Sequence, residues 1–294
     1  MSNTYLRIAD TNLRPLAPGD EPAVDAYLNR HWASTMFMRA NLRMGGLVDQ
    51  GHPTQGTYVA MWDGATIEGL AVHYRNGALV LHAARHLGIV VREAVAISQR
   101  PVMAIAGPWL QVETAATSTG VVERSRMVGT PQVLMTLDLG KLAVPEAAIR
   151  ENVRARLATM ADLETLLPWR MARDAETHGL PNTPPRRAAV RADMAEQIRV
   201  QGLYVAETKR LVAMASYDTW QPDGVQIGGV WVPPALREKG YGAVAVAEAA
   251  LAAYGHHVPR ATLLLEKAHR STAMSYRALG FTSIGDYGML SYPA

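Results

Sequence analysis

The fold of the second half of the chain is decided by the stretch Arg237–Ala243, which reads Arg-Glu-Lys-Gly-Tyr-Gly-Ala. It follows the apolar run Val225–Val232 and leads into the alanine-rich run Gly240–Tyr254. Pro233 and Pro234 end the apolar run, because proline cannot donate to a sheet ladder. The sequence therefore predicts a strand, a glycine-rich loop and a helix in direct succession.

This predicted loop has the properties of an anion site. The first N–H groups of a helix have no intrahelical partner, and the helix dipole adds positive charge there. Gly240 and Gly242 let the backbone come close to a bulky anion and adopt unusual dihedral angles. The pattern indicates a pyrophosphate site. The alternative is an ordinary strand-to-helix turn whose glycines only ease packing.

The rest of the second half alternates between strand and helix patterns. Thr159 and Asp162 have capping-box spacing, and Pro184 is placed to be the first residue of a helix. Pro168 is expected to kink or split the helix that begins at Thr159. We expect strands at 153–157, 204–207, 211–217, 225–232 and 261–265, and helices from 159, from 183, at 240–254 and from 271 to 280. This alternation predicts an α/β or α+β fold.

Short similarities recur in the same order in both halves of the chain. The clearest is Gly56–Ala60, which recurs as Gly202–Ala206. Such repetition indicates a duplicated fold of roughly 140 residues per copy. We expect a linker near Gly140–Glu151, and hence one domain at 1–144 and a second at 145–294.

The composition argues against several classes of protein and site. The chain has 294 residues, no cysteine and a formal net charge of +3. Without cysteine there are no disulfides or thiolate metal sites, which fits a reducing cytoplasm. The charge is too small and scattered for nucleic-acid binding, and no long uncharged apolar run predicts a membrane span. His256 and His257 are adjacent and do not share a helix face, so we expect no metal.

Two further stretches carry a family resemblance. The run Ile227–Pro234 precedes Arg237, and Tyr276 lies four residues before the pair Gly280-Phe281. With the glycine-rich loop, these features resemble the GNAT acetyltransferases over essentially the whole second half. The resemblance implies two tandem GNAT-like domains, each a mixed twisted sheet flanked by helices, with a degenerate first copy. It also implies transfer of an acetyl group from acetyl-CoA to a primary amine, on a small molecule or a peptide, by direct attack in a ternary complex.

The resemblance assigns roles to individual residues. The backbone of Val230 and Val232 would bind the pantetheine arm between two splayed strands, and the Val230 N–H would polarise the thioester carbonyl. Tyr276 would protonate the departing thiolate, the alternative being a packed aromatic. His269 stands where many relatives have an asparagine that touches the cofactor. The expected cofactor-binding set is Val230, Trp231, Val232, Arg237, Glu238, Lys239, Gly240, Tyr241, Gly242, Ala243, His269 and Tyr276.

The general base is not identified by the resemblance. Gln226 stands where histone-type relatives have a glutamate, and an amide cannot act as a base, although it can hold a water. Glu207 ends a strand and could reach the acceptor pocket, whereas Asp218 and Asp223 are expected to serve the loop around Pro222. The missing base motivates one alternative, a non-catalytic CoA-binding regulatory module. The glycine-rich loop itself leaves another, a different protein that binds a phosphate ligand there.

The matching loop of the first half is Arg85–Val90, which reads Arg-His-Leu-Gly-Ile-Val. It keeps the arginine and the first glycine, but Val90 replaces the second, and this stiff side chain is expected to obstruct a pyrophosphate. We therefore expect the first half to have lost cofactor binding. It would act as a scaffold, as a wall of the acceptor pocket or as a homodimer surface.

Overall fold

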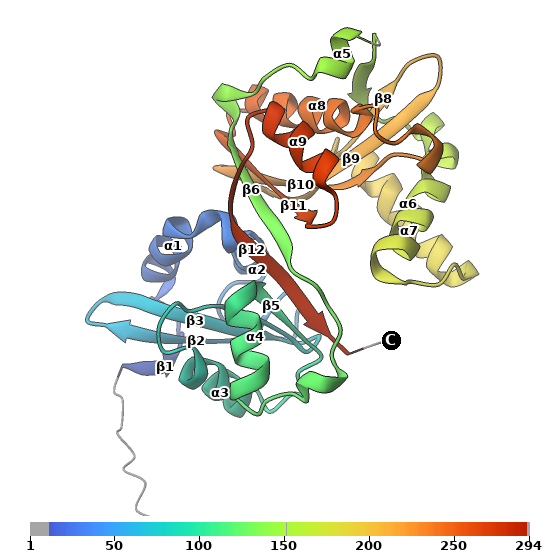
Figure 1. Cartoon of the computed structure of the whole chain (residues 1–294). Coiled ribbons are helices and arrows are strands. Elements are labelled where there is room, and N and C mark those ends of the chain that lie inside the picture. The colour runs from blue at the N-terminus through green and yellow to red at the C-terminus, as the bar shows by residue number, and fades with distance from the viewer. Residues whose placement is uncertain (1–11, 151, 293–294) are drawn as a thin grey trace, which may run out of the picture. The chain divides into compact units, whose positions relative to one another are not determined.

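The computed structural model describes residues 12–150 and 152–292, which fall into two compact units (Figure 1). Unit 1 comprises Met1–Gln132 and Asp286–Ala294, and unit 2 comprises Val133–Gly285. Each unit is a mixed sheet with apolar helix faces packed on both sides. This confirms the predicted architecture of two mixed sheets flanked by helices.

Unit 1 builds its sheet from five of its own strands and the end of the last strand of the chain. Its elements are β1 (Leu13–Pro15), α1 (Glu21–Arg30), α2 (Met36–Gly45), β2 (Gly56–Asp63), β3 (Thr66–Tyr74), β4 (Ala78–His82), α3 (Leu87–Ser98), β5 (Ala104–Pro108), α4 (Trp109–Ser118) and the later residues of β12 (Thr282–Ser291). The strand order is β1-β2-β3-β4-β5-β12, and β4–β5 is the parallel pair. Helices α1 and α2 pack on one face of this sheet, and α3 and α4 on the other.

Unit 2 repeats this plan. Its elements are β6 (Gln132–Asp138), α5 (Glu146–Arg150), β7 (Arg154–Leu157), α6 (Leu163–His178), α7 (Pro184–Arg199), β8 (Leu203–Glu207), β9 (Leu211–Gln221), β10 (Gly224–Trp231), α8 (Tyr241–Gly255), β11 (Arg260–Glu266) and α9 (Arg270–Ala278). The strand order is β6-β11-β10-β9-β8-β7, and β10–β11 is parallel. Helices α8 and α9 pack on one face of the sheet, and α6 and α7 on the other (Figure 1).

Local signals in the sequence act as predicted at the starts of helices. Thr159 and Asp162 form a reciprocal capping box, and Thr183 accepts a hydrogen bond from the Arg186 N–H at the start of α7. Pro168, in contrast, neither splits nor ends a helix, because α6 runs unbroken through it. The proline lies in the second turn of α6, so only one backbone hydrogen bond near the helix start is lost.

The chain passes between the two compact units at residues 132–133 and 285–286, while the domains expected at 1–144 and 145–294 stay a prediction. Strand β6, apart from its first residue, belongs to unit 2, although it precedes the expected linker. Conversely, Tyr287–Ser291 of β12 pairs with Ala104–Pro108 of β5 in unit 1. An alternating pattern predicts a strand but not its partner, so this exchange of strands could not be inferred from local sequence.

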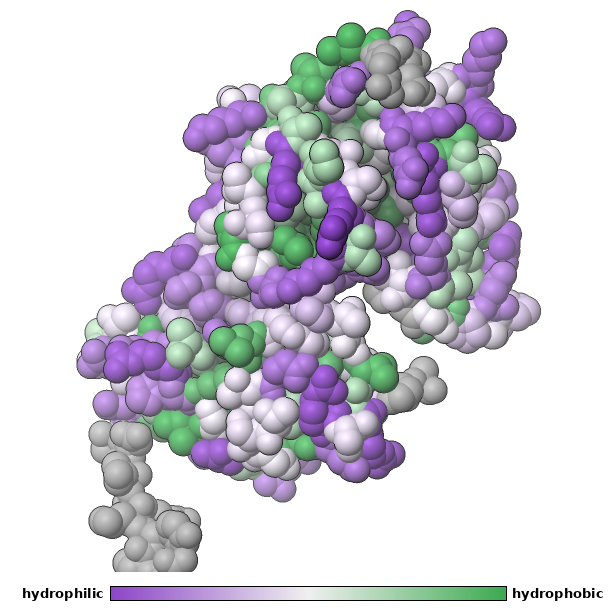
Figure 2. Space-filling view, in the orientation of Figure 1, coloured by the Kyte–Doolittle hydropathy of each residue, from purple (hydrophilic) through white to green (hydrophobic). Residues whose placement is uncertain are grey.

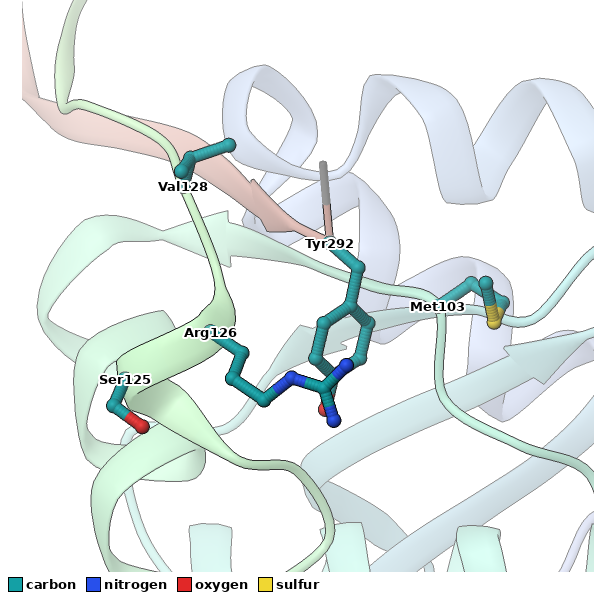
Figure 3. A pocket seen from close by; sticks show the side chains of 5 residues that line it. All are labelled: Met103, Ser125, Arg126, Val128 and Tyr292. Atoms are coloured by element: carbon teal, nitrogen blue, oxygen red, sulfur yellow. The ribbon is translucent and has the colours of Figure 1, made fainter. Parts of the chain in front are cut away.

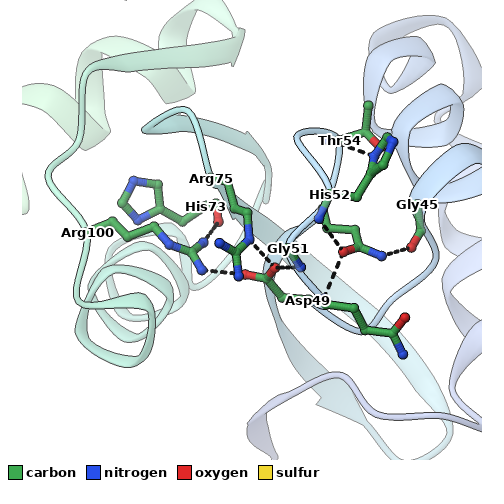
Figure 4. Close-up of polar contacts among 10 residues, drawn as sticks. Gly45, Asp49, Gly51, His52, Thr54, His73, Arg75 and Arg100 are labelled. Carbon is green, nitrogen blue, oxygen red and sulfur yellow. Dashed lines mark hydrogen bonds and ion pairs between the residues drawn. The ribbon is translucent and has the colours of Figure 1, made fainter.

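A network of polar side chains orders the segment between α2 and β2 in unit 1 (Figure 4). Asp49 accepts hydrogen bonds from Arg75, at 2.6 Å, and from Arg100. The Gln55 side chain accepts from two backbone N–H groups of this segment, Gln50 at 2.8 Å and His52 at 3.0 Å. These bonds satisfy loop backbone groups that no strand or helix pairs.

A second polar group in unit 1 lies in its core. The Tyr27 hydroxyl donates to the His82 carbonyl at 2.6 Å, and the His31 and His82 rings are 4.2 Å apart. Burial, followed by the charge of His31, lowers the pKa of His82 from 6.5 to about 4. His82 is therefore neutral in the folded protein at pH values where it is partly protonated in the unfolded chain.

We expect unit 1 to lose stability as the pH falls from about 6.5 to about 4. The folded-state pKa of His82 lies below the unfolded value, so the unfolded chain binds the extra proton, and the stabilisation present above pH 6.5 disappears near pH 4. The full effect is about 3 kcal/mol. Urea unfolding at several pH values measures it, and His82→Gln should flatten the slope while His52→Gln should not. Equal slopes in all three proteins would contradict the prediction.

Candidate active site

The head of α8 is open to an anion. Gly240 and Glu238 both adopt the left-handed conformation, with φ of 77° and 66°. Within residues 12–150 and 152–292, the N–H groups of Glu238, Lys239, Gly240 and Gly242 donate to no protein acceptor. The Tyr241 side chain is buried in the apolar cluster under α8 and anchors this loop. Unpartnered N–H groups at the positive end of a long helix form a site for a phosphate group.

Beside this helix head, β10 and β11 stop pairing although both strands continue. Their parallel register runs from Val225–Ala261 to Ile227–Leu263 and ends there. We call the two ends that no longer pair with each other, Gly228–Trp231 and Leu264–Glu266, the fork. A bulge against β9 spans Gly228 to Trp231, and Gly229 has φ of 61°. The predicted pantetheine-binding residues Val230 and Val232 thus lie within and directly after the unpaired end of β10.

Gly242 connects the helix head to the fork. A Cβ atom built on Gly242 would lie 3.3 Å from Val230 Cγ1 and 3.4 Å from Val232 Cγ2. The α8 backbone therefore approaches the end of β10 closely, and a larger side chain would extend between them. The structure brings the predicted loop and the predicted strand residues together in one place.

The Arg237 side chain braces the loop between β10 and α8. It donates to the Val232 carbonyl at 3.2 Å, pairs with Glu176 of α6 at 2.8 Å and lies 4.7 Å from the centre of the Trp231 ring. Trp231 itself is buried against α6 and α7. Arg237 and Trp231 thus fix the path of the chain after β10.

Tyr276 lies on α9, and the Gly280-Phe281 pair that follows ends this helix. Gly280 has φ of 102°, and the Phe281 N–H donates to the Tyr276 carbonyl at 3.0 Å. The Tyr276 ring is 4% exposed, in the apolar cluster against which Val230 and Val232 pack. Burial raises the pKa of Tyr276 above its ordinary value, so the hydroxyl keeps its proton at neutral pH.

Gln226 belongs to a row of buried polar side chains across three strands. It pairs with Thr219 on β9 and with Thr262 on β11, two positions before the fork. Gln226 Nε2 and the hydroxyls of both threonines are buried with no hydrogen-bond partner in the described part of the chain. Val225 and Ile227 face α8, so this row lies on the opposite face of the sheet, the face of α6 and α7.

The carboxylates near the sheet have different surroundings. Glu207 is held by Arg156 of β7, Nε to Oε2 3.1 Å, and its strand is two away from β10 in the sheet. Asp223 binds Arg260 beside the turn that it was expected to serve. Asp218, expected to serve the same turn, instead lies against Gly228. A Cβ atom built on Gly228 would be 1.9 Å from Asp218 Oδ2.

Sequence reasoning missed the position of Asp218 because an irregularity in the sheet determines it. The register between β9 and β10 shifts between Gln226 and Ile227, so Asp218 is an extra residue of β9 between Tyr217 and Thr219. A bulged residue can direct its side chain differently from a regular strand residue. The missed signal is the pair Gly228-Gly229, because glycine in a strand often marks a bulge or a close approach.

His269 lies at the start of α9 with its side chain 51% exposed. Its ring nitrogen is 3.9 Å from Glu266, and the structure shows no capping hydrogen bond from it to α9. Its predicted contact with a cofactor therefore stays a prediction.

The corresponding helix of unit 1 shows how its loop differs. His86, with φ of 59°, precedes α3 as Gly240 precedes α8, so Gly88 corresponds to Gly242. Val90 is fully buried in the core beneath α3, so the expectation that its side chain obstructs the loop was wrong. An alignment of Arg85 with Arg237 places the loop of unit 1 two residues out of register with the structure.

The strands of unit 1 also remain close where those of unit 2 separate. The β4–β5 register ends at Val80–Ala106, and at the next position a Cβ atom built on Gly107 would be 2.4 Å from the Leu81 carbonyl. Unit 1 therefore has no counterpart of the fork at this position.

A separate hollow of about 750 Å³ lies in unit 1 (Figure 3). It is lined by Met103, Ser125, Arg126, Val128 and Tyr292, and the Arg126 guanidinium lies 5.8 Å from the centre of the Tyr292 ring. It contains no pair of groups arranged for acid–base chemistry.

Two searches for other kinds of site gave negative results over residues 12–150 and 152–292. No three His, Asp or Glu side chains there are grouped to hold a metal ion. None of the helices described there combines the length and apolar character needed to cross a bilayer. Figure 2 shows hydrophilic residues spread over the visible face of both units, with apolar residues between them.

Comparison with known proteins agrees with this geometry. Residues 168–281 match the model of the Acetyltransferase (GNAT) family, a match that begins within α6 and contains α7 to α9 and the fork. No curated protein sequence matches the chain. The likeness to solved structures, at 14% identity or below for those described next, shows the fold alone.

Three solved structures resemble nearly the whole chain. An acetyltransferase of the GNAT family from Colwellia psychrerythraea is 13% identical, with TM-score 0.51 over 96% of this chain and 99% of that one. A GCN5-related N-acetyltransferase from Sphaerobacter thermophilus is 14% identical, with TM-score 0.54 over 95% and 94%. A tandem GNAT protein from the clavulanic acid biosynthesis pathway is 13% identical, with TM-score 0.50 over 95% and 97%.

We expect Gly242→Val to weaken coenzyme A binding at least about tenfold, or 1.4 kcal/mol. The new side chain would enter the space beside Val230 and Val232, where a Cβ atom alone is already in tight contact. Calorimetric titration of coenzyme A measures the effect. Gly88→Val, at the corresponding position of α3, is the matched control and should leave the affinity unchanged. Unaltered binding by a folded Gly242→Val protein would contradict this placement of the site.

Proposed function

We propose that the GNAT domain of this chain, matched at residues 168–281, is an N-acetyltransferase that moves an acetyl group from acetyl-CoA to an amine. One observation carries the proposal: unpartnered N–H groups at the head of α8 lie beside a strand whose end is unpaired on the β11 side. This combination suits a long ligand with a diphosphate at one end and amide groups along its arm. Coenzyme A has these parts, and its acetyl thioester supplies an activated acyl group.

The residues of unit 2 divide the binding task. The N–H groups of Glu238, Lys239, Gly240 and Gly242 would hold the diphosphate, helped by the dipole of α8. The backbone of Val230 and Val232 would bind the arm as an additional strand would. A backbone N–H aimed at the thioester oxygen is commonly worth about 3 kcal/mol of transition-state stabilisation. Gly242 is required because it keeps α8 and β10 close.

Two side chains would transfer protons, one to the thiolate that leaves and one from the ammonium group of the acceptor. Tyr276 keeps its proton at neutral pH and would give it to the thiolate that leaves. Asp218 lies against Gly228, where the fork begins, and would attract an ammonium group and take its proton, directly or through a water. The unpartnered atoms of Gln226, Thr219 and Thr262 are suited to hold such a water, because a buried water needs two to four polar partners.

Unit 1 would serve as scaffold or acceptor-side wall and bind no coenzyme A of its own. Two observations support this part of the proposal. His86 takes the place of Gly240 at the head of α3, and β4 stays in contact with β5 where a fork would begin. Self-association of the protein through unit 1 is a further part of this proposal.

We expect Tyr276→Phe to lower kcat by about 10²-fold or more, with the affinity for acetyl-CoA unchanged. The substitution keeps the buried ring and removes only the proton donor. Thiol release from acetyl-CoA with a panel of amines measures kcat, and calorimetry measures binding. Tyr254→Phe, on the exposed end of α8, is the matched control. Binding of acetyl-CoA by the wild-type protein without turnover of any amine would favour a regulatory CoA-binding module instead.

A further inference from the structure

The connection between β6 and β7 crosses the helix-covered face of unit 2 and lies outside the matched family domain. The two strands stand at opposite ends of the strand order β6-β11-β10-β9-β8-β7, so the chain between them has to pass over one face of this sheet. We call residues 139–148 of this connection the strap. Figure 1 shows it in green, passing over α8 and ending in α5. It precedes the family match at residues 168–281 and is no part of that domain.

The strap begins near the C-terminal end of α8 and proceeds toward the head of that helix. The Leu139 N–H donates to the carbonyl of Pro259, in the turn between α8 and β11, at 2.9 Å. The Ala143 N–H then donates to the Leu279 carbonyl, at the end of α9, at 3.1 Å. Within the described residues, this is the only backbone hydrogen bond that joins residues 142–148 to another element. Few such bonds are typical of a segment with low local stability.

The strap covers the side of α8 that the sheet leaves open. Residues 243–247 of α8 are all buried, and five successive residues of a helix point to all of its sides. A helix that is apolar all round needs cover on every side. Ala147 is 6% exposed and belongs to the apolar cluster of α8, and Leu142 and Ala148 pack against the same cluster.

Ala147 is the strap residue that meets the proposed diphosphate site. A Cβ atom built on Gly240 would lie 3.2 Å from Ala147 Cβ, which is tighter than ordinary van der Waals contact. Gly240 has φ of 77°, and its N–H is one of those at the head of α8 that donate to no protein acceptor. The small side chain of Ala147 therefore allows α5 to pack directly on the backbone that would hold the diphosphate.

We propose that Ala147 is a positioning residue for the cofactor, and that packing of the strap and binding of the coenzyme A diphosphate stabilise each other. The packed strap keeps the backbone around Gly240 in the conformation that presents its N–H groups, and a bound diphosphate keeps the same backbone in place for the strap. Such coupling is reciprocal, because each event changes the free energy of the other by the same amount. This inference rests on the proposed function, because the diphosphate is that of acetyl-CoA.

The first test replaces Ala147 with leucine, which is too large for the contact with Gly240. We expect Ala147→Leu to weaken coenzyme A binding at least about tenfold in calorimetric titration, because overpacking displaces the backbone. S-acetylpantetheine has the thioester and the arm but no diphosphate, so its affinity should stay unchanged. KM for acetyl-CoA should rise while kcat at saturation stays the same. Ala147→Ser, which keeps a small side chain, should behave as the wild type does.

Ala143→Leu is the matched control, because Ala143 is an exposed residue of the same strap, and it should leave all these values unchanged. An equal loss of affinity for coenzyme A and S-acetylpantetheine in a folded Ala147→Leu protein overturns the proposal, because a general structural role would have this effect.

The second test uses the wild-type protein and needs no variant. By reciprocity, saturating coenzyme A should slow hydrogen exchange of residues 142–148 by about the same factor, roughly tenfold, and S-acetylpantetheine should not. Unchanged exchange in these residues with coenzyme A bound overturns the inference and leaves the acetyl transfer standing. Slowed exchange without turnover of any amine supports the strap and rejects the acetyl transfer.

Discussion

Unit 2 depends on two parallel strands that stop pairing while both continue. Backbone N–H and C=O groups must be hydrogen-bonded, so an unpaired strand end in the middle of a sheet costs free energy unless another partner completes it. The left-handed Gly229 and the bulge around it produce this irregularity in β10. Gly242 then allows the head of α8, with its own unpartnered N–H groups, to lie beside the same strand. Two incomplete sets of backbone groups in one place favour a single long ligand over two separate ones.

The elements that local chemistry determines could be predicted from the sequence. The strand predicted at 225–232 is β10, Gly224–Trp231, and the helix predicted at 240–254 is α8, Tyr241–Gly255. Prolines end the first and glycines begin the second, and both effects act within a few residues. The partners of β6 and β12 could not be predicted, because strand pairing depends on contacts far along the chain. For the same reason Asp218 was assigned to a turn, whereas a shift in register between neighbouring strands directs it to the fork.

The two units are built alike around these strands, yet their parallel strands separate at the fork in unit 2 and stay together in unit 1. Both units place a left-handed residue before the helix that follows the parallel strand, His86 in one and Gly240 in the other. Only four residues separate the end of β4 from α3, whereas nine separate β10 from α8 and include the two prolines. The longer connection of unit 2 allows β10 to continue beyond its last pair with β11. The shorter one keeps Leu81 against Gly107.

Gly228 connects the proposed cofactor side of the fork with its proposed acceptor side. Its missing side chain is what lets the Asp218 carboxylate lie directly on the strand, because any Cβ atom there would collide with it. The Asp218 carboxylate is thereby brought to the fork, where the charge of Arg173 on α6 attracts it.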